Sequence, residues 1–373
     1  MKILFAAGGT GGHINPALAA AGEIRERYPD AEILFVGAKG KMEAKLVPGA
    51  GFDLETIRIA GFQRKISIEN IFRNILAILY LILSPLSVRR IIKKFKPDVV
   101  VGFGGYVSGP VVQMAAKMGI PTAIHEQNAY PGVTNKTLAK TVDRVMLTAE
   151  EAEKHLSAKN KPIVTGLPVR GAMLKADREK SRKELGIRDD QKLVLSMGGS
   201  LGALTINNAM VDLISEYSKN KNLYFLHAMG QYGLWVPDKL KELGVDASKE
   251  ENVEIREYIN DMDRCMSAAD VVICRAGASS LSELQALGKA SILIPSPNVS
   301  ENHQYHNAMA LVNKGAALIV EEKDLTKEKM AELFESLVYD DDKRLSIEGN
   351  AKAMAVTDAK EQIADIIVSL IKK

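Results

Sequence analysis

Short runs of apolar residues alternate along the chain with longer stretches in which apolar residues recur every three or four positions. The short runs are rich in Val, Ile and Leu and lack polar alternation, which is typical of strands buried on both faces of a parallel sheet. One series lies at 3–7, 33–36, 99–103, 122–125, 145–148 and 163–165, and a second at 193–196, 223–227, 253–256, 271–274, 291–294 and 317–320. This strand–helix alternation predicts a doubly wound α/β architecture.

Each series begins with a strand that runs into a glycine turn, AAGGTGGH at 6–13 and SMGGSLGA at 196–203. A chain of 373 residues also exceeds what one core usually serves. We therefore predict two Rossmann-like domains, 1–165 and 166–354, with a helix at about 355–373 that packs back on the first. Ligands of open α/β sheets bind at the carboxyl ends of the strands, so a cleft is expected between the domains.

The overall composition fits a globular protein, and its charge is unevenly distributed. Hydrophobic residues make up 46% and charged residues 25%, and the two cysteines, Cys265 and Cys274, are expected to be reduced core residues. The net charge is +3, yet residues 58–98 hold nine basic and two acidic side chains. A local basic patch indicates an anionic surface or substrate and argues against nucleic-acid binding.

Within that basic stretch, the run ILAILYLIL extends from Ile75 to Leu83. A membrane span needs about 20 apolar residues, so this run is too short. Two interpretations stay open, a helix buried in the core and a helix that lies on a membrane surface. Flanking basic residues, which anionic headgroups attract, favour the second; they are Arg73, Arg89, Arg90, Lys93, Lys94 and Lys96.

The first glycine loop, Gly8 to His13, follows a strand and precedes a helical pattern. Glycines let the backbone approach a ligand, and the amide groups of a helix N-terminus attract anions. The spacing matches neither the dinucleotide pattern nor a P-loop. A tight structural turn is the alternative. His13 ends the loop and is a candidate general base.

Polar or glycine-rich segments follow several other predicted strands. Two of them, 104–110 and 125–128, end strands of the first half, and the loop 198–203 repeats the glycine pattern in the second half. Residues 274–283 combine small residues, hydroxyls and Glu283, which suits a phosphate cradle with a ribose-binding carboxylate. A capping box formed by Ser280 and Glu283 is the alternative interpretation.

Two segments raise the question of a metal ion. Residues 302–307 are dense in neutral hydrogen-bonding groups, which suits sugar hydroxyls, and they contain a pair of histidines three positions apart. No cysteine or carboxylate cluster accompanies that pair. Asp261 and Asp263 form a D-x-D pattern, but a helix N-cap explains Asp261 better. We therefore predict neither a divalent metal nor a cofactor.

Five motifs, in this order, resemble those of the MurG family, the UDP-N-acetylglucosamine–N-acetylmuramyl-(pentapeptide) pyrophosphoryl-undecaprenol N-acetylglucosamine transferases of peptidoglycan synthesis. They are GGTGGH at 8–13, GGYVSGP at 104–110, HEQN at 125–128, GGSLGA at 198–203 and RAGASSLSE at 275–283. The resemblance covers nearly the whole chain and implies a GT-B fold with acceptor in the first half and donor in the second. The chain departs from the family at Leu167, where Asn is common, and keeps Arg170.

The resemblance also implies the site residues. His13 is similar to the family's proposed base, with Glu126 in reserve. The implied substrate contacts are Thr10, Gly11, Gly12, Asn128, Arg170, Ser200, Ile259 at the uracil, Ala278, Ser279, Ser280, Leu281, Ser282, Glu283 and Gln304 on the sugar.

The implied reaction is inverting and metal-independent. It moves N-acetylglucosamine from UDP-N-acetylglucosamine to the C4 hydroxyl of N-acetylmuramyl-pentapeptide on undecaprenyl diphosphate, at the cytoplasmic face of the membrane. The stretch around 75–83 is similar to the family's proposed membrane patch. Two alternatives stay open, a UDP-N-acetylglucosamine epimerase and a non-catalytic nucleotide-sugar-binding adaptor.

Overall fold

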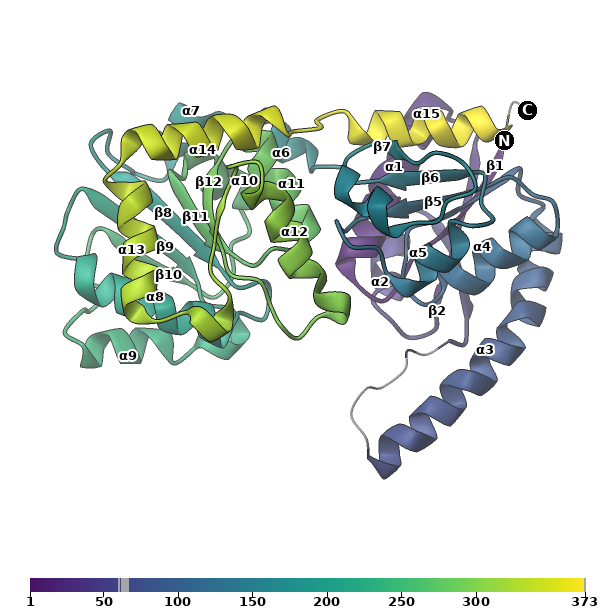
Figure 1. Ribbon diagram of the computed structural model, residues 1–373, viewed down its shortest axis with the longest axis horizontal. Coiled ribbons are helices and arrows are strands. Elements are labelled where there is room, and N and C mark those ends of the chain that lie inside the picture. The colour runs from purple at the N-terminus through teal and green to yellow at the C-terminus, as the bar shows by residue number, and fades with distance from the viewer. Residues whose placement is uncertain (60, 62–66, 372–373) are drawn as a thin grey trace. The chain divides into compact units, whose positions relative to one another are not determined.

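A computed structural model describes residues 1–59, 61 and 67–371 of the chain, which forms two compact units (Figure 1). Unit 1 comprises Met1–Pro168 and Asp358–Lys373, and unit 2 comprises Val169–Thr357. The chain therefore passes from one unit to the other twice, after Pro168 and after Thr357. Each unit is built around its own parallel sheet, as the apolar runs predicted.

The sheet of unit 1 has the strand order β3-β2-β1-β4-β5-β6-β7, and all its pairings are parallel. The order changes direction between β1 and β4, which makes their carboxyl ends the switch point at which such sheets bind ligands. The strands are β1 (Lys2–Ala6), β2 (Glu32–Ala38), β3 (Asp53–Ile57), β4 (Val99–Gly102), β5 (Thr122–Glu126), β6 (Arg144–Leu147) and β7 (Ile163–Val164).

Apolar helix faces cover both sides of this sheet. Stacked rings of Phe5 and Phe35 lie in the core, and α15 adds Ile363 and Ile367 to the same cluster. In Figure 1, α15 lies alongside α1, which it contacts closely. The helices are α1 (Gly11–Arg27), α2 (Glu43–Gly49), α3 (Ile68–Phe95), α4 (Ser108–Lys117), α5 (Val133–Leu138), α15 (Ala359–Ile371) and the 3-10 helix η1 (Glu150–His155).

The sheet of unit 2 repeats the plan with six parallel strands in the order β10-β9-β8-β11-β12-β13. Its switch point lies between β8 and β11. The strands are β8 (Lys192–Met197), β9 (Leu223–Ala228), β10 (Val253–Arg256), β11 (Val271–Cys274), β12 (Ala290–Leu293) and β13 (Leu318–Ile319).

Helices flank this second sheet and complete its core, in which the rings of Phe225 and Phe334 stack. Cys265 and Cys274 are free and buried, as expected. The helices are α6 (Gly171–Lys175), α7 (Arg178–Glu184), α8 (Leu204–Tyr217), α9 (Val236–Glu242), α10 (Met262–Ala268), α11 (Ala278–Leu287), α12 (His303–Val312), α13 (Lys327–Val338), α14 (Asp341–Ala353) and the 3-10 helices η2 (Gln231–Gly233), η3 (Ser300–Asn302) and η4 (Glu322–Asp324).

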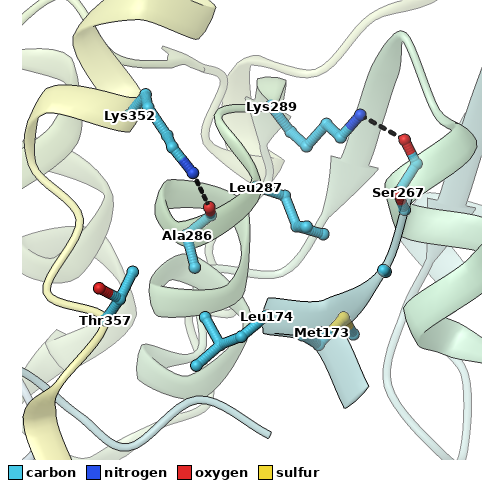
Figure 2. A pocket seen from close by; sticks show the side chains of 9 residues that line it. Met173, Leu174, Ser267, Ala286, Leu287, Lys289, Lys352 and Thr357 are labelled. Atoms are coloured by element: carbon cyan, nitrogen blue, oxygen red, sulfur yellow. Dashed lines mark hydrogen bonds between the residues drawn. The ribbon is translucent and has the colours of Figure 1, made fainter. Parts of the chain in front are cut away.

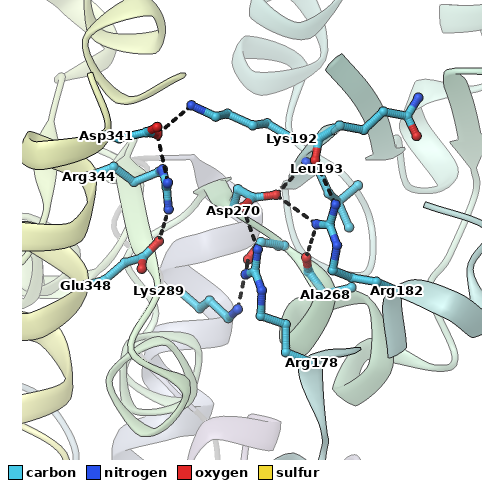
Figure 3. Close-up of polar contacts among 12 residues, drawn as sticks. Arg178, Arg182, Lys192, Leu193, Ala268, Asp270, Lys289, Asp341, Arg344 and Glu348 are labelled. Atoms are coloured by element: carbon cyan, nitrogen blue, oxygen red, sulfur yellow. Dashed lines mark hydrogen bonds and ion pairs between the residues drawn. The ribbon is translucent and has the colours of Figure 1, made fainter. Parts of the chain in front are cut away.

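A buried carboxylate, Asp270, fastens α7 to the central strands of unit 2 (Figure 3). Its oxygens accept hydrogen bonds from Arg178 at 2.7 Å, from Arg182 at 3.0 Å and from the Leu193 amide at 2.8 Å. Burial acts to raise the pKa of Asp270, but the charges of Arg178 and Arg182 and the hydrogen bonds outweigh it and hold the pKa below its usual value.

Asp270→Ala is expected to lower the free energy of unfolding by about 3 kcal/mol, because it leaves the buried Arg182 without its counter-ion. Urea denaturation with Asp365→Ala as control measures this, since Asp365 forms an ion pair at the surface and should contribute below about 1 kcal/mol. The depressed pKa also predicts that the contribution of Asp270 is present above about pH 4 and is lost as the pH falls through its folded pKa. Equal losses in both variants would contradict the assignment.

Candidate functional site

The predicted donor contacts of unit 2 follow the carboxyl ends of its strands. Ser200 comes after β8, Ile259 after β10, residues 278–283 after β11 and Gln304 after β12. All strands of this sheet are parallel, so these loops share one edge of the unit. Arg170 precedes α6 and reaches the same edge, because its Nε donates a hydrogen bond of 2.7 Å to Glu283 Oε1.

Helix α11 starts directly after the small residues that follow β11. Its N-cap is Gly277, which makes no side-chain cap, so the capping-box interpretation of Ser280 and Glu283 is wrong. Ala278, Ser279, Ser280, Leu281, Ser282 and Glu283 instead form the first turns of the helix. The first amides of a helix lack partners within it, and they favour an anion at this end.

The loop after β8 contains two glycines in a left-handed backbone conformation that other residues rarely adopt. Gly199 and Gly202 have φ of +91° and +83°, and a Cβ on Gly202 would lie 2.1 Å from the Met229 carbonyl oxygen. Ser200, between these glycines, is exposed. Gln304 is held by its Oε1, which accepts the Ser296 amide at 2.9 Å, and Ile259 is buried.

In unit 1, the loop after β1 orients the ring of His13. Thr10 is the N-cap of α1, and Gly11, Gly12 and His13 form its first turn. His13 Nδ1 lies 3.2 Å from the Gly8 carbonyl oxygen and 3.2 Å from Thr10 Oγ1. A carbonyl oxygen only accepts hydrogen bonds, so Nδ1 carries the hydrogen of the neutral ring and Nε2 is its basic nitrogen.

The loop after β4 packs against this histidine loop at the switch point. Gly104 and Gly105 have φ of +93° and +79°. A Cβ on Gly104 would lie 3.0 Å from His13 Nε2, and one on Gly105 would lie 2.2 Å from the Gly8 oxygen. The close approach of the two glycine loops therefore places Nε2 of the imidazole beside Gly104.

The segment after β5 is more buried than its polar sequence suggested, because His125, Glu126 and Gln127 are all buried. Glu126 Oε1 accepts from the amide and the side chain of Asn128, and Oε2 accepts from Gly132 N and Asn135 Nδ2. Burial raises the pKa of Glu126, and these hydrogen bonds oppose the rise. Glu126 thus organises the loop at 128–135, whereas the geometry at His13 suits a base better.

Nothing in the described part of the chain gathers a metal-binding cluster of three or more His, Cys, Asp or Glu residues. Asp261 occupies the N-cap position of α10, as expected, but its side chain makes no capping hydrogen bond, and its carboxylate accepts from Arg256 at 2.8 Å instead. Among the described helices, none is long and apolar enough to cross a membrane.

A cavity of about 480 Å³ lies at the opposite end of α11 from the predicted donor contacts (Figure 2). Two lysines that line the cavity donate hydrogen bonds from Nζ to backbone carbonyl groups at helix ends. Lys289 donates to the Ser267 and Ala269 carbonyls at 2.6 and 2.8 Å, and Lys352 donates to that of Ala286. Burial, and secondly the charge of Arg178, lowers the pKa of Lys289 to about 7. These hydrogen bonds satisfy carbonyl groups at the carboxyl ends of α10 and α11 and so stabilise both helix ends.

Both units match models of one protein family. Residues 3–147 match the glycosyltransferase family 28 N-terminal domain, and residues 193–363 match its C-terminal domain. The crystal structure of Acinetobacter baumannii MurG superposes with a TM-score of 0.81 and 28% identity over 99% of both chains. The two family matches make the chain a glycosyltransferase of family 28, and its two parallel α/β units have the GT-B fold.

Relatives of known name show to which family of glycosyltransferases the chain belongs. The UDP-N-acetylglucosamine–N-acetylmuramyl-(pentapeptide) pyrophosphoryl-undecaprenol N-acetylglucosamine transferase of Acetivibrio thermocellus is 45% identical over all of this chain and 99% of its own. The enzyme of the same name from Bacillus cytotoxicus is 40% identical over the full length of both. The chain therefore belongs to this transferase family and is a hexosyltransferase.

Proposed function

We propose that the protein transfers N-acetylglucosamine from UDP-N-acetylglucosamine to the C4 hydroxyl of N-acetylmuramyl-pentapeptide on undecaprenyl diphosphate, forming lipid II from lipid I in peptidoglycan synthesis. The full-length relatives carry this substrate pair in their names. The observation that carries the proposal is the oriented imidazole of His13, which presents a basic nitrogen at a glycine-lined switch point.

The proposed chemistry is a single inverting displacement. The acceptor hydroxyl is a weak nucleophile, so His13 Nε2 takes its proton while the new bond to C1 of the donor sugar forms. The bond from C1 to the diphosphate breaks, and UDP leaves with the electron pair. The negative charge of the leaving diphosphate is stabilised by Arg170, by the amino end of α11 and by the hydroxyls of Ser279, Ser280 and Ser200. No metal takes part in this mechanism.

Measuring UDP release from UDP-N-acetylglucosamine on addition of purified lipid-linked muramyl-pentapeptide tests this function. We expect acceptor-dependent release that persists in EDTA, because protein groups neutralise the diphosphate. Loss of activity in EDTA and its recovery with Mg²⁺ would contradict the metal-free mechanism. A new UDP-sugar formed without acceptor would indicate an epimerase, and donor binding without release would indicate an adaptor.

We also place the protein at the cytoplasmic face of the membrane, held peripherally by α3. Large apolar side chains of α3 are exposed and spaced three or four residues apart, which puts them on one helix face; they are Phe72, Ile75, Leu79, Leu83 and Leu86, each 47 to 70% exposed. These side chains contradict the buried-helix interpretation. Exposed basic residues follow towards the carboxyl end of α3, which suits anionic headgroups; they are Arg89, Arg90, Lys93, Lys94 and Lys96. Arg64 and Lys65 lie outside the described residues.

Replacing both Leu79 and Leu83 with Glu is expected to weaken binding to vesicles rich in anionic lipid by at least about tenfold. Each leucine that the membrane buries contributes about 1.5–3 kcal/mol to binding. Co-sedimentation with such vesicles measures the change. Leu243→Glu, an equally exposed leucine of unit 2, serves as the control and should bind like the unsubstituted protein. Unchanged binding of the double variant would remove α3 from the membrane contact.

A further inference from the structure

The buried carboxylate of Glu43 lies directly beneath the histidine loop. Glu43 is the first residue of α2 and is fully buried. Its Oε1 accepts the Ala38 amide at 2.7 Å, and its Oε2 accepts the Gly9 amide at 3.2 Å. A Cβ on Gly8 would lie 2.4 Å from Oε1, and one on Gly37 would lie 2.5 Å from Cγ. The space for this carboxylate therefore depends on two glycines from different strand ends.

Glu43 and His13 bind opposite ends of one peptide group. The carboxylate accepts the N–H of Gly9, and the C=O of the same peptide, which belongs to Gly8, accepts the Nδ1–H of His13 at 3.2 Å. The peptide bond is conjugated, so a negative charge at its N–H increases the electron density on its oxygen. A stronger acceptor at Gly8 stabilises positive charge on the imidazole.

We propose that Glu43 is a positioning residue that acts on His13 through the Gly8–Gly9 peptide, a carboxylate–peptide–imidazole relay. This inference rests on the proposed function, in which His13 is the base. When Nε2 takes the proton of the acceptor hydroxyl, Nδ1 keeps its own hydrogen, the peptide supports the imidazolium, and Glu43 remains a carboxylate. No proton passes along the relay. It works as a buried aspartate does when it contacts a catalytic histidine directly.

Glu43 supplies the negative charge of this arrangement. Thr10 approaches the ring from its own loop, Gly104 approaches from the end of β4, and Gln127 Oε1 from the end of β5 also faces Gly104. These three groups are neutral. Glu43 brings a carboxylate to the loop from α2, and the pH profile of a variant at this position should report the effect of its charge on His13.

Glu43→Gln keeps the shape of the side chain, removes its charge and replaces one of its two acceptor oxygens with an NH2 group, so its thermal stability is measured beside its kinetics. We expect kcat to fall about tenfold or more, the KM for UDP-N-acetylglucosamine to stay within about twofold, and the acidic limb of the kcat–pH profile to move to lower pH. In the His13→Ala background the same substitution should have no further effect on kcat, because the relay has lost its target. Glu23→Gln is the matched control, since Glu23 is a buried glutamate of α1 that pairs with Lys360.

An unchanged pH profile together with an equal loss of kcat in both backgrounds would overturn the relay and leave Glu43 a merely structural role. The wild-type protein offers a second test that does not depend on the folding of Glu43→Gln. ¹⁵N NMR of histidine-labelled protein, assigned with His13→Ala, should show the Nδ1–H form of the neutral His13 ring, and a predominant Nε2–H form would overturn the relay. Failure of the proposed function looks different, because wild-type protein would then release no UDP when acceptor is added.

Discussion

Replacing His13 with alanine is expected to lower kcat by about 10²- to 10⁴-fold while the Kd for UDP-N-acetylglucosamine stays within about twofold. The expected size reflects general-base catalysis, because water replaces an oriented imidazole as the proton acceptor. Donor affinity should persist because most of the predicted donor contacts belong to unit 2, whereas His13 belongs to unit 1. The measurements are acceptor-dependent UDP release at saturating substrates and calorimetric titration with the donor.

Two further variants make the result specific for His13. His155→Ala removes an exposed histidine of η1 in the same unit and should leave kcat unchanged. Glu126→Gln should instead lower thermal stability, because it disturbs the hydrogen bonds that hold the loop after β5. If His13→Ala kept near-normal turnover while Glu126→Gln lost it without loss of stability, the role of base would move to Glu126.

Most of the fold could be predicted because the central strands of a parallel sheet are buried on both faces and leave continuous apolar runs. All twelve predicted runs correspond to strands. The strand that the apolar pattern missed is β3, with the sequence DLETI. It lies at the edge of its sheet and pairs with β2 alone, so polar side chains are tolerated along it.

The site could be predicted in part, because glycine loops and helix starts leave local signals whereas burial and hydrogen bonding depend on distant contacts. The sequence shows Glu126 only as a polar residue at a strand end. In the structure its carboxylate accepts hydrogen bonds from the loop that follows. Glu43 was missed because it lies outside every motif. Its signal is indirect, since Gly8 and Gly37 must both lack a side chain for the carboxylate to fit.

The contact between Arg170 and Glu283 bears on how the donor is held. Arg170 Nε donates a hydrogen bond to Glu283 Oε1, and this bond fixes the orientation of the Glu283 carboxylate, which is largely buried. The second oxygen, Oε2, has two lone pairs with which it can accept from the hydroxyls of a ribose. We therefore expect Arg170 to support ribose binding through Glu283, in addition to any direct contact with the diphosphate.

Glu283→Gln is accordingly expected to raise the Kd for UDP-N-acetylglucosamine by about 10- to 100-fold, because a hydrogen bond to a charged acceptor contributes about 1.5–3 kcal/mol. Calorimetric titration measures the change. Glu348→Gln is the matched control, since Glu348 also pairs with an arginine, Arg344, at 2.8 Å but lies on α14.

A donor analogue with 2′-deoxyribose tests the contact between Glu283 and the ribose itself. The wild-type protein should bind it more weakly than the natural donor, whereas Glu283→Gln should discriminate little between the two. Equal discrimination by both proteins would show that Glu283 does not contact this hydroxyl, and the ribose would then have to be assigned to another part of the edge formed by β8, β11 and β12.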